Sequence, residues 1–214
     1  MRILAVADIH GKKENLEKII NAISQHNPDL LVIAGDIFNF HIPRAAAELL
    51  SSIKVPILGI RGNSDPSWLE SKIRSFTPVR LLSSSPLTFQ GISFMGLSGT
   101  VPLPFASKIQ FFENRILKTA EQLINNHSIL VVHPPPRGVR DQVGGRISAG
   151  SAGIRRLLLN KKPMAVICGH IHEQSGIGQL ASVPVINCAM NKFYGGAIIE
   201  CDNNSIKSIE MIKL

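Results

Sequence analysis

The side chains best able to do chemistry in this sequence come just after short apolar runs. Asp8 and His10 follow the run RILAVA, and Asp36 follows LLVIA. Three later runs, ILGI, ILVV and MAVIC, lead to further oxygen and nitrogen donors in the same way. The full set is Asp8, His10, Asp36, Asn63, His133, His170 and His172. Carboxylate, imidazole and amide oxygen without thiolate favour Mn²⁺, Fe or Zn²⁺ over a soft-metal site.

Each of these residues has an ordinary structural explanation when it is taken alone. An aspartate at a strand end often caps a turn, and a single histidine there is more often hydrogen-bonded than a ligand. The pair His170 and His172 is weak evidence because alternate residues of any extended segment point the same way. Five such coincidences, all expected at one sheet edge, are improbable as capping accidents. We therefore interpret the set as one site.

The number of donors indicates more than one ion. Seven ligands are too many for a single cation and suit two cations that share a bridging carboxylate. Two metals roughly 3.5–4 Å apart can hold a bridging hydroxide and neutralise the oxygens of an in-line phosphoryl displacement.

The elements that must position these donors alternate along the chain. We expect strands at Arg2–Ala7, Leu30–Ala34, Pro56–Ile60, Ile129–Val132 and Met164–Cys168. We expect helices at Lys13–Gln25, Pro43–Ser51, Pro66–Ser75, Lys108–Asn125 and 151–160, the last entered through Ser151. Alternation of this kind predicts a buried parallel core, and ligands then bind at the carboxyl ends of the strands.

Other stretches contain strand patterns without helices. They are Val79–Leu97, with a turn at Gln90-Gly91, and the chain from 174 to its last strand at Ile206–Ile212. Such stretches predict antiparallel additions to the parallel core. The expected fold is an α/β two-sheet sandwich flanked by helices, in one domain over residues 1–214.

Composition places the chain among ordinary globular proteins, with 44% hydrophobic and 18% charged residues. The first apolar run is too short for a signal-peptide core, and no run approaches the roughly 18 apolar residues that span a membrane. Cys168, Cys188 and Cys201 are odd in number and widely spaced, which is typical of buried thiols in a reducing compartment. We expect a cytoplasmic protein with no membrane partner.

Charge favours anionic partners. The chain has 23 basic and 15 acidic residues and a formal net charge of +8. Phosphate esters or nucleic acid would suit that balance, although a basic bias of the source proteome would explain it equally well. No run of five or more basic residues marks a dedicated nucleic-acid tail.

The order Asp-x-His, Gly-Asp, Gly-Asn-x-Asp, His, Gly-His-x-His resembles the calcineurin-like metallophosphoesterase superfamily. The resemblance spans Asp8 to His172 and implies a pair of β-sheets flanked by helices. By position, it implies a first ion held by Asp8, His10 and His172, a second held by Asn63, His133 and His170, and Asp36 bridging both. Two divalent ions are implied, with Mn²⁺ as the first choice and Fe, Zn²⁺ and Ni²⁺ as alternatives.

One position departs from the family pattern. Many members have a histidine after the asparagine of the third block, where it contacts the phosphate or helps the leaving group. Here that residue is Ser64, so Asp65 lacks an imidazole partner. A hydroxyl can donate a hydrogen bond to phosphate but is a poor proton donor. Substrates with a good leaving group should suffer least.

Further substrate contacts are expected from neighbouring loops. Asn39 and His41 follow Asp36 closely, although a loop histidine at a helix start is more often structural. The Pro- and Gly-rich loop 134–150 contributes Arg137, whose guanidinium suits phosphate capture, and the alternative is a solvated basic loop. Segment Ser98–Phe105 is apolar enough for a pocket wall or a homodimer contact, and the oligomeric state stays open.

Our first hypothesis is a small-molecule phosphodiesterase that works through a hydroxide bridging two metal ions, with phosphomonoester hydrolysis as the alternative. Asp36, Asn63 and His133 would be its catalytic residues. A nuclease of the same superfamily is the second, although 5% aromatic residues suggest no stacking platform for nucleic acid. A non-catalytic scaffold is the third, and the complete set of donors argues against it.

Overall fold

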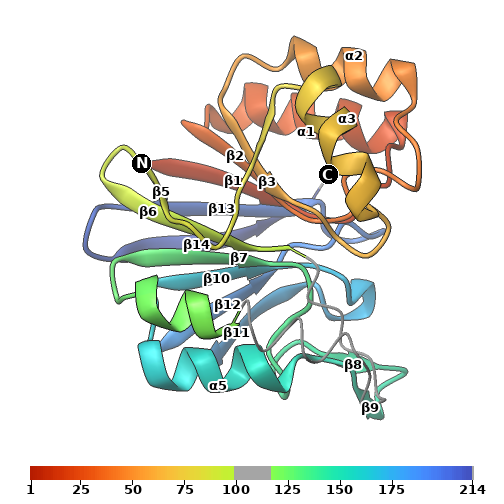
Figure 1. Cartoon of the computed structure of the whole chain (residues 1–214). Coiled ribbons are helices and arrows are strands. Elements are labelled where there is room, and N and C mark those ends of the chain that lie inside the picture. Colours follow the sequence, from red (N-terminus) through yellow and green to blue (C-terminus); the bar gives the residue numbers. More distant parts are fainter. Residues whose placement is uncertain (99–116, 214) are drawn as a thin grey trace.

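The structure is a computed structural model that describes residues 1–98 and 117–213. Two six-stranded sheets pack face to face with helices outside them (Figure 1). The expected α/β two-sheet sandwich flanked by helices is therefore confirmed.

The first sheet has the strand order β14-β13-β1-β2-β3-β4. Its strands are β1 Arg2–Val6, β2 Leu30–Ala34, β3 Ile57–Ile60, β4 Val79–Leu81, β13 Gly196–Cys201 and β14 Ile206–Ile212. Strands β1 to β4 are parallel, and β13 and β14 extend the sheet in antiparallel pairs. The parallel core and the antiparallel strands β13 and β14 agree with the sequence pattern. Strand β4 differs, because it comes from the stretch expected to add antiparallel strands and is parallel to β3.

The second sheet has the strand order β11-β12-β10-β7-β6-β5. Its strands are β5 Leu87–Phe89, β6 Ile92–Leu97, β7 Ser128–Val132, β10 Ala165–Cys168, β11 Gly176–Leu180 and β12 Val183–Asn187. The edge strands β5 and β11 are antiparallel to their neighbours, and the predicted turn at Gln90-Gly91 joins β5 to β6. Strands β6 and β12 differ from our expectation of antiparallel additions, because β6 pairs in parallel with β7 and β12 pairs in parallel with β10.

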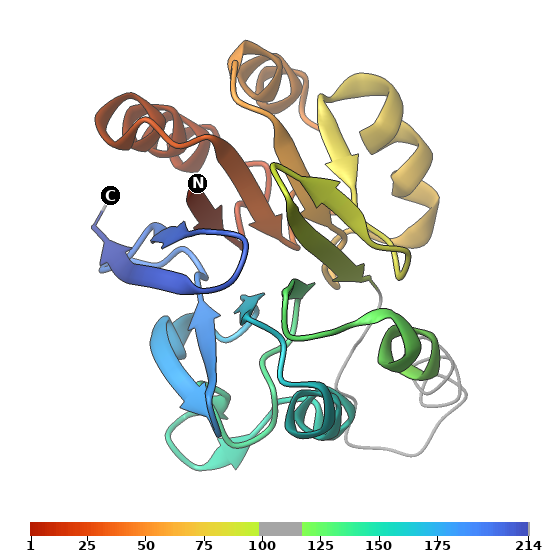
Figure 2. The ribbon, with the colours of Figure 1, turned by 90° about the vertical axis from the view of Figure 1, so that its left-hand side faces the viewer.

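Helices cover the outer faces of both sheets. They are α1 Lys13–His26, α2 Arg44–Ser52, α3 Glu70–Phe76 and α5 Ala152–Lys161, with 3₁₀ turns η1 Ser67–Leu69 and η2 His172–Gln174. The first three lie on one side of the molecule and α5 on the other (Figures 1 and 2). Helix α5 starts as predicted, because Ser151 Oγ accepts the amide of Ile154 at 3.1 Å.

Some expected elements differ from the structure or extend outside the described residues. The expected helix Pro66–Ser75 is η1 followed by α3. Loop 134–150 contains a short hairpin, β8 Gln142–Val143 and β9 Ile147–Ser148, turning at two glycines with positive φ. Of the expected helix Lys108–Asn125, residues 117–123 are helical, and part of it lies outside the described residues. Most of Ser98–Phe105 also lies outside them.

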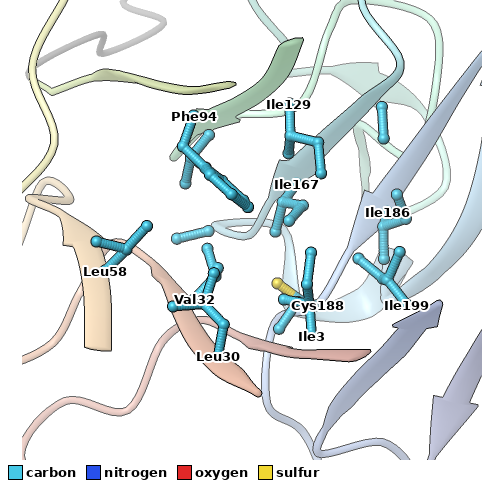
Figure 3. Packing of buried hydrophobic residues seen from close by; sticks show 14 of the residues in the cluster. Ile3, Leu30, Val32, Leu58, Phe94, Ile129, Ile167, Ile186, Cys188 and Ile199 are labelled. Carbon is cyan, nitrogen blue, oxygen red and sulfur yellow. The ribbon is translucent and has the colours of Figure 1, made fainter. Parts of the chain in front are cut away.

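The main core lies between the two sheets. Val32 of the first sheet packs there with Phe94 and Ile167 of the second, all fully buried (Figure 3). All residues of β2 and β7 are buried because both faces of each sheet are covered. This packing fixes how the two sheets lie against each other.

The strand ends that lead to the donors belong to two sheets, so our expectation of one sheet edge was wrong. Strands β1, β2 and β3 lie in the first sheet, whereas β7 and β10 lie in the second. Periodicity identifies strands but says nothing about which strands pair. The two edges meet, since His133 Nδ1 lies 2.9 Å from the carbonyl of Ala34.

No helix within residues 1–98 and 117–213 combines the length and apolar character needed to cross a bilayer.

Candidate metal centre

Asp8 lies at the centre of the joined strand ends. Its side chain is almost fully buried, and Oδ1 lies 3.2 Å from Nε2 of His172. The Nε2 atoms of His10 and His133 each lie 4.0 Å from the same oxygen. Three imidazoles that come from three different strand ends therefore point at one carboxylate oxygen.

Asp36 faces the same space from the end of β2. Its Oδ2 lies 3.8 Å from His10 Nε2, and its Oδ1 lies 3.5 Å from His133 Nε2. Ser64 holds both oxygens, because its amide donates to Oδ1 at 2.7 Å and its hydroxyl donates to Oδ2 at 2.8 Å. One carboxylate oxygen is thus directed toward each side of the cluster.

His133 is buried and held at both ring nitrogens. Nδ1 contacts the carbonyl of Ala34, which suits a tautomer that carries its proton on Nδ1 and leaves Nε2 available to a cation. Nε2 lies 2.9 Å from Oδ1 of Asn63, which can only accept, so without a cation the ring also carries a proton on Nε2. The ring of His170 approaches that of His133 edge-on at 5.0 Å between centroids.

These contacts sort the donors into two groups. Asp8, His10 and His172 can place one ligand atom each within 4.8 Å of one another, and so can Asp8, Asp36 and His133. Asn63 and His170 contact the second group through His133. All seven predicted donors are therefore brought together. Their division differs from the expected one in that Asp8, and not Asp36, is common to both groups.

The cluster fits a bound cation. Asp8 Oδ1 is buried and accepts no hydrogen bond from the described residues, although His172 Nε2 lies 3.2 Å away. A buried carboxylate oxygen without a partner costs free energy that a cation would recover. The oxygen and nitrogen donor set matches a hard or borderline divalent ion.

The electrostatics also favour positive charge at this place. Burial works to lower the pKa of His133, but Asp36 and Asp8 outweigh it and raise the pKa to about 9. Burial works to raise the pKa of Asp36, but His133 and the bonds from Ser64 outweigh it and lower the pKa to about 2. The carboxylate of Asp36 therefore stays ionised and attracts a cation, whether a proton or a metal.

Four of the seven donors have an uncommon backbone conformation. Asp8, His10, Asp36 and His170 all have φ between 50° and 71°, in the left-handed region that residues other than glycine rarely adopt. Such conformations cluster at functional sites because the surrounding structure must hold them.

Close packing around Asp36 requires a glycine. A Cβ atom on Gly62 would lie 2.1 Å from Asp36 Oδ1. Only glycine lets the loop after β3 approach the carboxylate, and Asn63 follows it directly.

Asp65 has a part in the site that the sequence did not reveal. Its fully buried carboxylate accepts the amides of Ile37 at 2.9 Å, Phe38 at 2.8 Å and Gly62 at 3.1 Å. Burial raises its pKa to about 6. Asp65 joins the loop that carries Asp36 to the loop that carries Asn63, and its position in the third motif was the available signal.

The remaining candidates lie outside the cluster. Asn39 and His41 are exposed, and in the described part of the chain neither bonds to any of the seven donors. Arg137 is exposed, and its backbone carbonyl accepts Arg155 at 2.8 Å. Arg140, in the same loop, donates to the carbonyl of Ile177 and is structural. Substrate contacts by Asn39, His41, Ser64 and Arg137 stay predictions.

The sequence of this chain is similar to those of known phosphoesterases and related proteins. The family model described as calcineurin-like phosphoesterase matches residues 1–174. UPF0046 protein K07C11.7 of Caenorhabditis elegans is 31% identical over 116 residues, which are 53% of this chain and 38% of that protein. A subunit of the nuclease SbcCD of Staphylococcus epidermidis is 28% identical over 155 residues, which are 58% of this chain and 40% of that protein. The chain spans about two-fifths of the length of these relatives.

Solved structures share the fold. The protein TT1561 of Thermus thermophilus has a TM-score of 0.70 at 16% identity, covering 99% of this chain and 98% of that one. A dimetal phosphatase from Danio rerio has a TM-score of 0.63 at 12% identity, covering 99% and 95%. An archaeal phosphodiesterase has a TM-score of 0.54 at 15% identity, with both chains fully covered.

Proposed function

The chain belongs to the calcineurin-like phosphoesterase family, and from that premise we propose that it is a dinuclear metal-dependent hydrolase of phosphodiester bonds. One observation carries the proposal. The buried oxygen Asp8 Oδ1 has no hydrogen-bond partner among the described residues and is common to two groups of metal-capable donors. The folds shared with a dimetal phosphatase and a phosphodiesterase support it.

The first proposed ligand set is one of the two groups, and the second set shares His133 with the other group. Asp8, His10 and His172 would hold one ion, and Asn63, His133 and His170 would hold the other, with Asp36 between them. When bound, two divalent cations supply the positive charge that activates water and offsets the charge of phosphate oxygens. Mn²⁺ is our first choice, and Fe, Zn²⁺ and Ni²⁺ suit the same donors.

The protein's own contribution is to hold these groups in place before substrate arrives. The Ala34 carbonyl orients the ring of His133, and Ser64 orients both oxygens of Asp36. The side chain of Asn63 is exposed at the mouth of the cluster, where its amide can reach a phosphate oxygen. Fixed charges and dipoles of this kind stabilise charge in the transition state without reorganisation.

Preference for diesters with good leaving groups follows from Ser64. Its hydroxyl already donates to Asp36 Oδ2, so that proton is not free for a leaving group. Without a general acid at this position, hydrolysis depends on a leaving group that departs as an anion. Activated diesters meet that need better than alkyl monoesters do.

A cytoplasmic location is part of the proposal. All three cysteines are free and buried, and burial raises the pKa of each thiol. Unpaired thiols of this kind suit a reducing compartment.

A panel of phosphodiesters, phosphomonoesters and nucleotides, assayed with Mn²⁺, tests the function. Asn63→Ala should lower kcat by about 100-fold or more, since it removes a ligand and a donor to phosphate. Asn204→Ala is the matched control, because that asparagine is exposed and remote in sequence from every donor. Turnover by Asn63→Ala at the wild-type rate would overturn the assignment.

A nuclease is the second candidate, and the distribution of charge favours it. Residues 134–162, which begin directly after His133, contain seven basic side chains and one acidic side chain. That acid, Asp141, is buried and accepts bonds from Ser148 and Gly150. The match to a nuclease subunit agrees with this candidate. DNA binding that weakens steeply as the salt concentration rises would support the nuclease candidate. A lack of DNA binding at low salt would exclude it.

A further inference from the structure

An apolar groove of about 910 Å³ lies between α2 and α3 on the outside of the first sheet. Three large aromatic side chains line it and are more than half exposed, Phe40 at 60%, Trp68 at 55% and Phe76 at 64%. Exposed apolar surface gathered in one place marks a binding region more often than scattered exposure does.

One end of the groove lies beside the candidate metal centre. The amide of Phe40 donates to the carbonyl of Ser64 at 3.0 Å, and Ser64 in turn holds Asp36. Trp68 lies in η1, only four residues after Ser64. The loops that carry Asp36 and Asn63 therefore continue directly into the groove wall.

The other end of the groove lies away from the metal centre. Trp68 and Phe76 are separated by eight residues of 3₁₀ and α-helix, which is about 12 Å at 1.5 Å per residue. The groove thus has a near end, formed by Phe40 and Trp68, and a far end at Phe76.

We propose that the near end of this groove binds a planar aromatic group of the substrate, a nucleobase in its natural form, while the attached phosphodiester lies at the metal centre. This inference rests on the proposed function and adds the class of substrate. The substrate would be a nucleoside phosphodiester.

The chemistry of the groove wall suits such a group. Aromatic side chains stack on any base because every base presents a π-face. Lys72 lies over the ring of Trp68 at 5.5 Å from its centroid, and a cation can also contact the face of a base. The ion pair of Arg44 and Glu48, 2.8 Å apart, lines the same groove and offers both a donor and an acceptor for base edges.

No sequence pattern indicated this surface. An aromatic content of 5% argued against a stacking platform. Two of these few residues, Phe40 and Trp68, nevertheless line the same groove. Phe40 and Trp68 are 28 positions apart, and their loops are brought together by the pairing of β2 with β3 and by the bonds of Asp65.

Binding can be followed directly, because Trp68 is the only tryptophan in the chain. The full chain loaded with Mn²⁺ is titrated with AMP and, separately, with ribose 5-phosphate, which has the phosphate but no base. We expect AMP to quench the tryptophan fluorescence saturably and ribose 5-phosphate to leave it unchanged. Equal quenching by the two ligands, or none by AMP, would overturn the proposal.

Variants locate the contact. Phe40→Ala should weaken AMP binding about tenfold, within the range of a single lost stacking contact. Leu159→Ala is the control, because Leu159 is an exposed hydrophobic residue on α5, on the opposite side of the molecule. Undiminished AMP binding by Phe40→Ala would contradict the proposed contact.

Kinetics separate this inference from the proposed function. Thymidine 5′-(p-nitrophenyl phosphate) and ethyl p-nitrophenyl phosphate have the same leaving group, and only the first carries a base. Phe40→Ala and Trp68→Ala should each raise KM about tenfold for the thymidine ester and change kcat little. KM for the ethyl ester should be nearly unchanged. An equal rise for both esters would overturn the subsite.

Failure of the proposed function gives a different result. If neither ester is hydrolysed but AMP still quenches Trp68 and ribose 5-phosphate does not, the aromatic subsite stands and the hydrolase proposal fails.

Discussion

Ser64 shows how one residue shapes the candidate site. It holds Asp36 through both its amide and its hydroxyl, so it orients the carboxylate that we propose lies between the two ions. Hydrogen-bond partners of a metal ligand fix its orientation, and their loss commonly lowers metal affinity by about 10- to 100-fold.

We therefore predict that Ser64→Ala weakens Mn²⁺ binding by about tenfold or more, measured by isothermal titration calorimetry. Ser85→Ala serves as the matched control, because Ser85 is exposed and its side chain has no bond among the described contacts. Equal Mn²⁺ affinity in Ser64→Ala and wild type would mean that the hydroxyl does not orient Asp36.

His133 gives a prediction for pH. Its pKa is raised from 6.5 to about 9 in the fold, despite burial, because Asp36 and Asp8 are close. A raised pKa means that the protonated ring stabilises the fold. That stabilisation is complete below pH 6.5 and is lost as pH rises through about 9.

The midpoint of thermal unfolding of EDTA-treated protein should therefore fall between pH 6.5 and 9. In protein loaded with Mn²⁺ the cation takes the place of that proton, so the fall should be smaller and the stabilisation by metal should grow with pH. If the unfolding midpoint fell equally with pH in EDTA and in Mn²⁺, the cation would not take the place of the His133 proton.

At the scale of elements, Asp65 joins the loops after β2 and β3. Asp65→Asn replaces one acceptor oxygen by an amide group and leaves at least one buried amide of Ile37, Phe38 or Gly62 without its acceptor. We expect a loss of about 1–3 kcal/mol in the free energy of unfolding, measured by urea denaturation.

Metal affinity should fall with stability in Asp65→Asn, because the same two loops carry Asp36 and Asn63. The control is Glu14→Gln at an exposed position of α1, which should change stability by less than about 0.5 kcal/mol. If Asp65→Asn were as stable as wild type, the carboxylate would not be what joins the loops.

The elements that carry the donors could be predicted because each is a short strand of the parallel core, buried along all or nearly all of its length. Such strands have continuous apolar runs, and the polar residue that follows each run, such as Asp36 after β2, marks the strand end. Asp65 was harder to interpret, since its partners are backbone amides that no sequence pattern identifies. The aromatic groove was also hidden, because Phe40 and Trp68 come together through strand pairing and the bonds of Asp65.

At the scale of the whole molecule, the site depends on the contact between two sheets. The donors follow three strands of the first sheet and two of the second. The buried packing of Val32 against Phe94 and Ile167 sets how these edges meet. This division between sheets was beyond sequence analysis, since each strand has the same apolar pattern whichever sheet it joins.

The central claim is that seven side chains from both sheets hold two divalent cations. The most direct test is a crystal structure of Mn²⁺-loaded protein with anomalous scattering measured at the manganese edge. We predict two anomalous peaks, one beside Asp8, His10 and His172 and one beside Asn63, His133 and His170, with Asp36 contacting both. Peaks found elsewhere, or no peak among these residues at saturating Mn²⁺, would contradict the account.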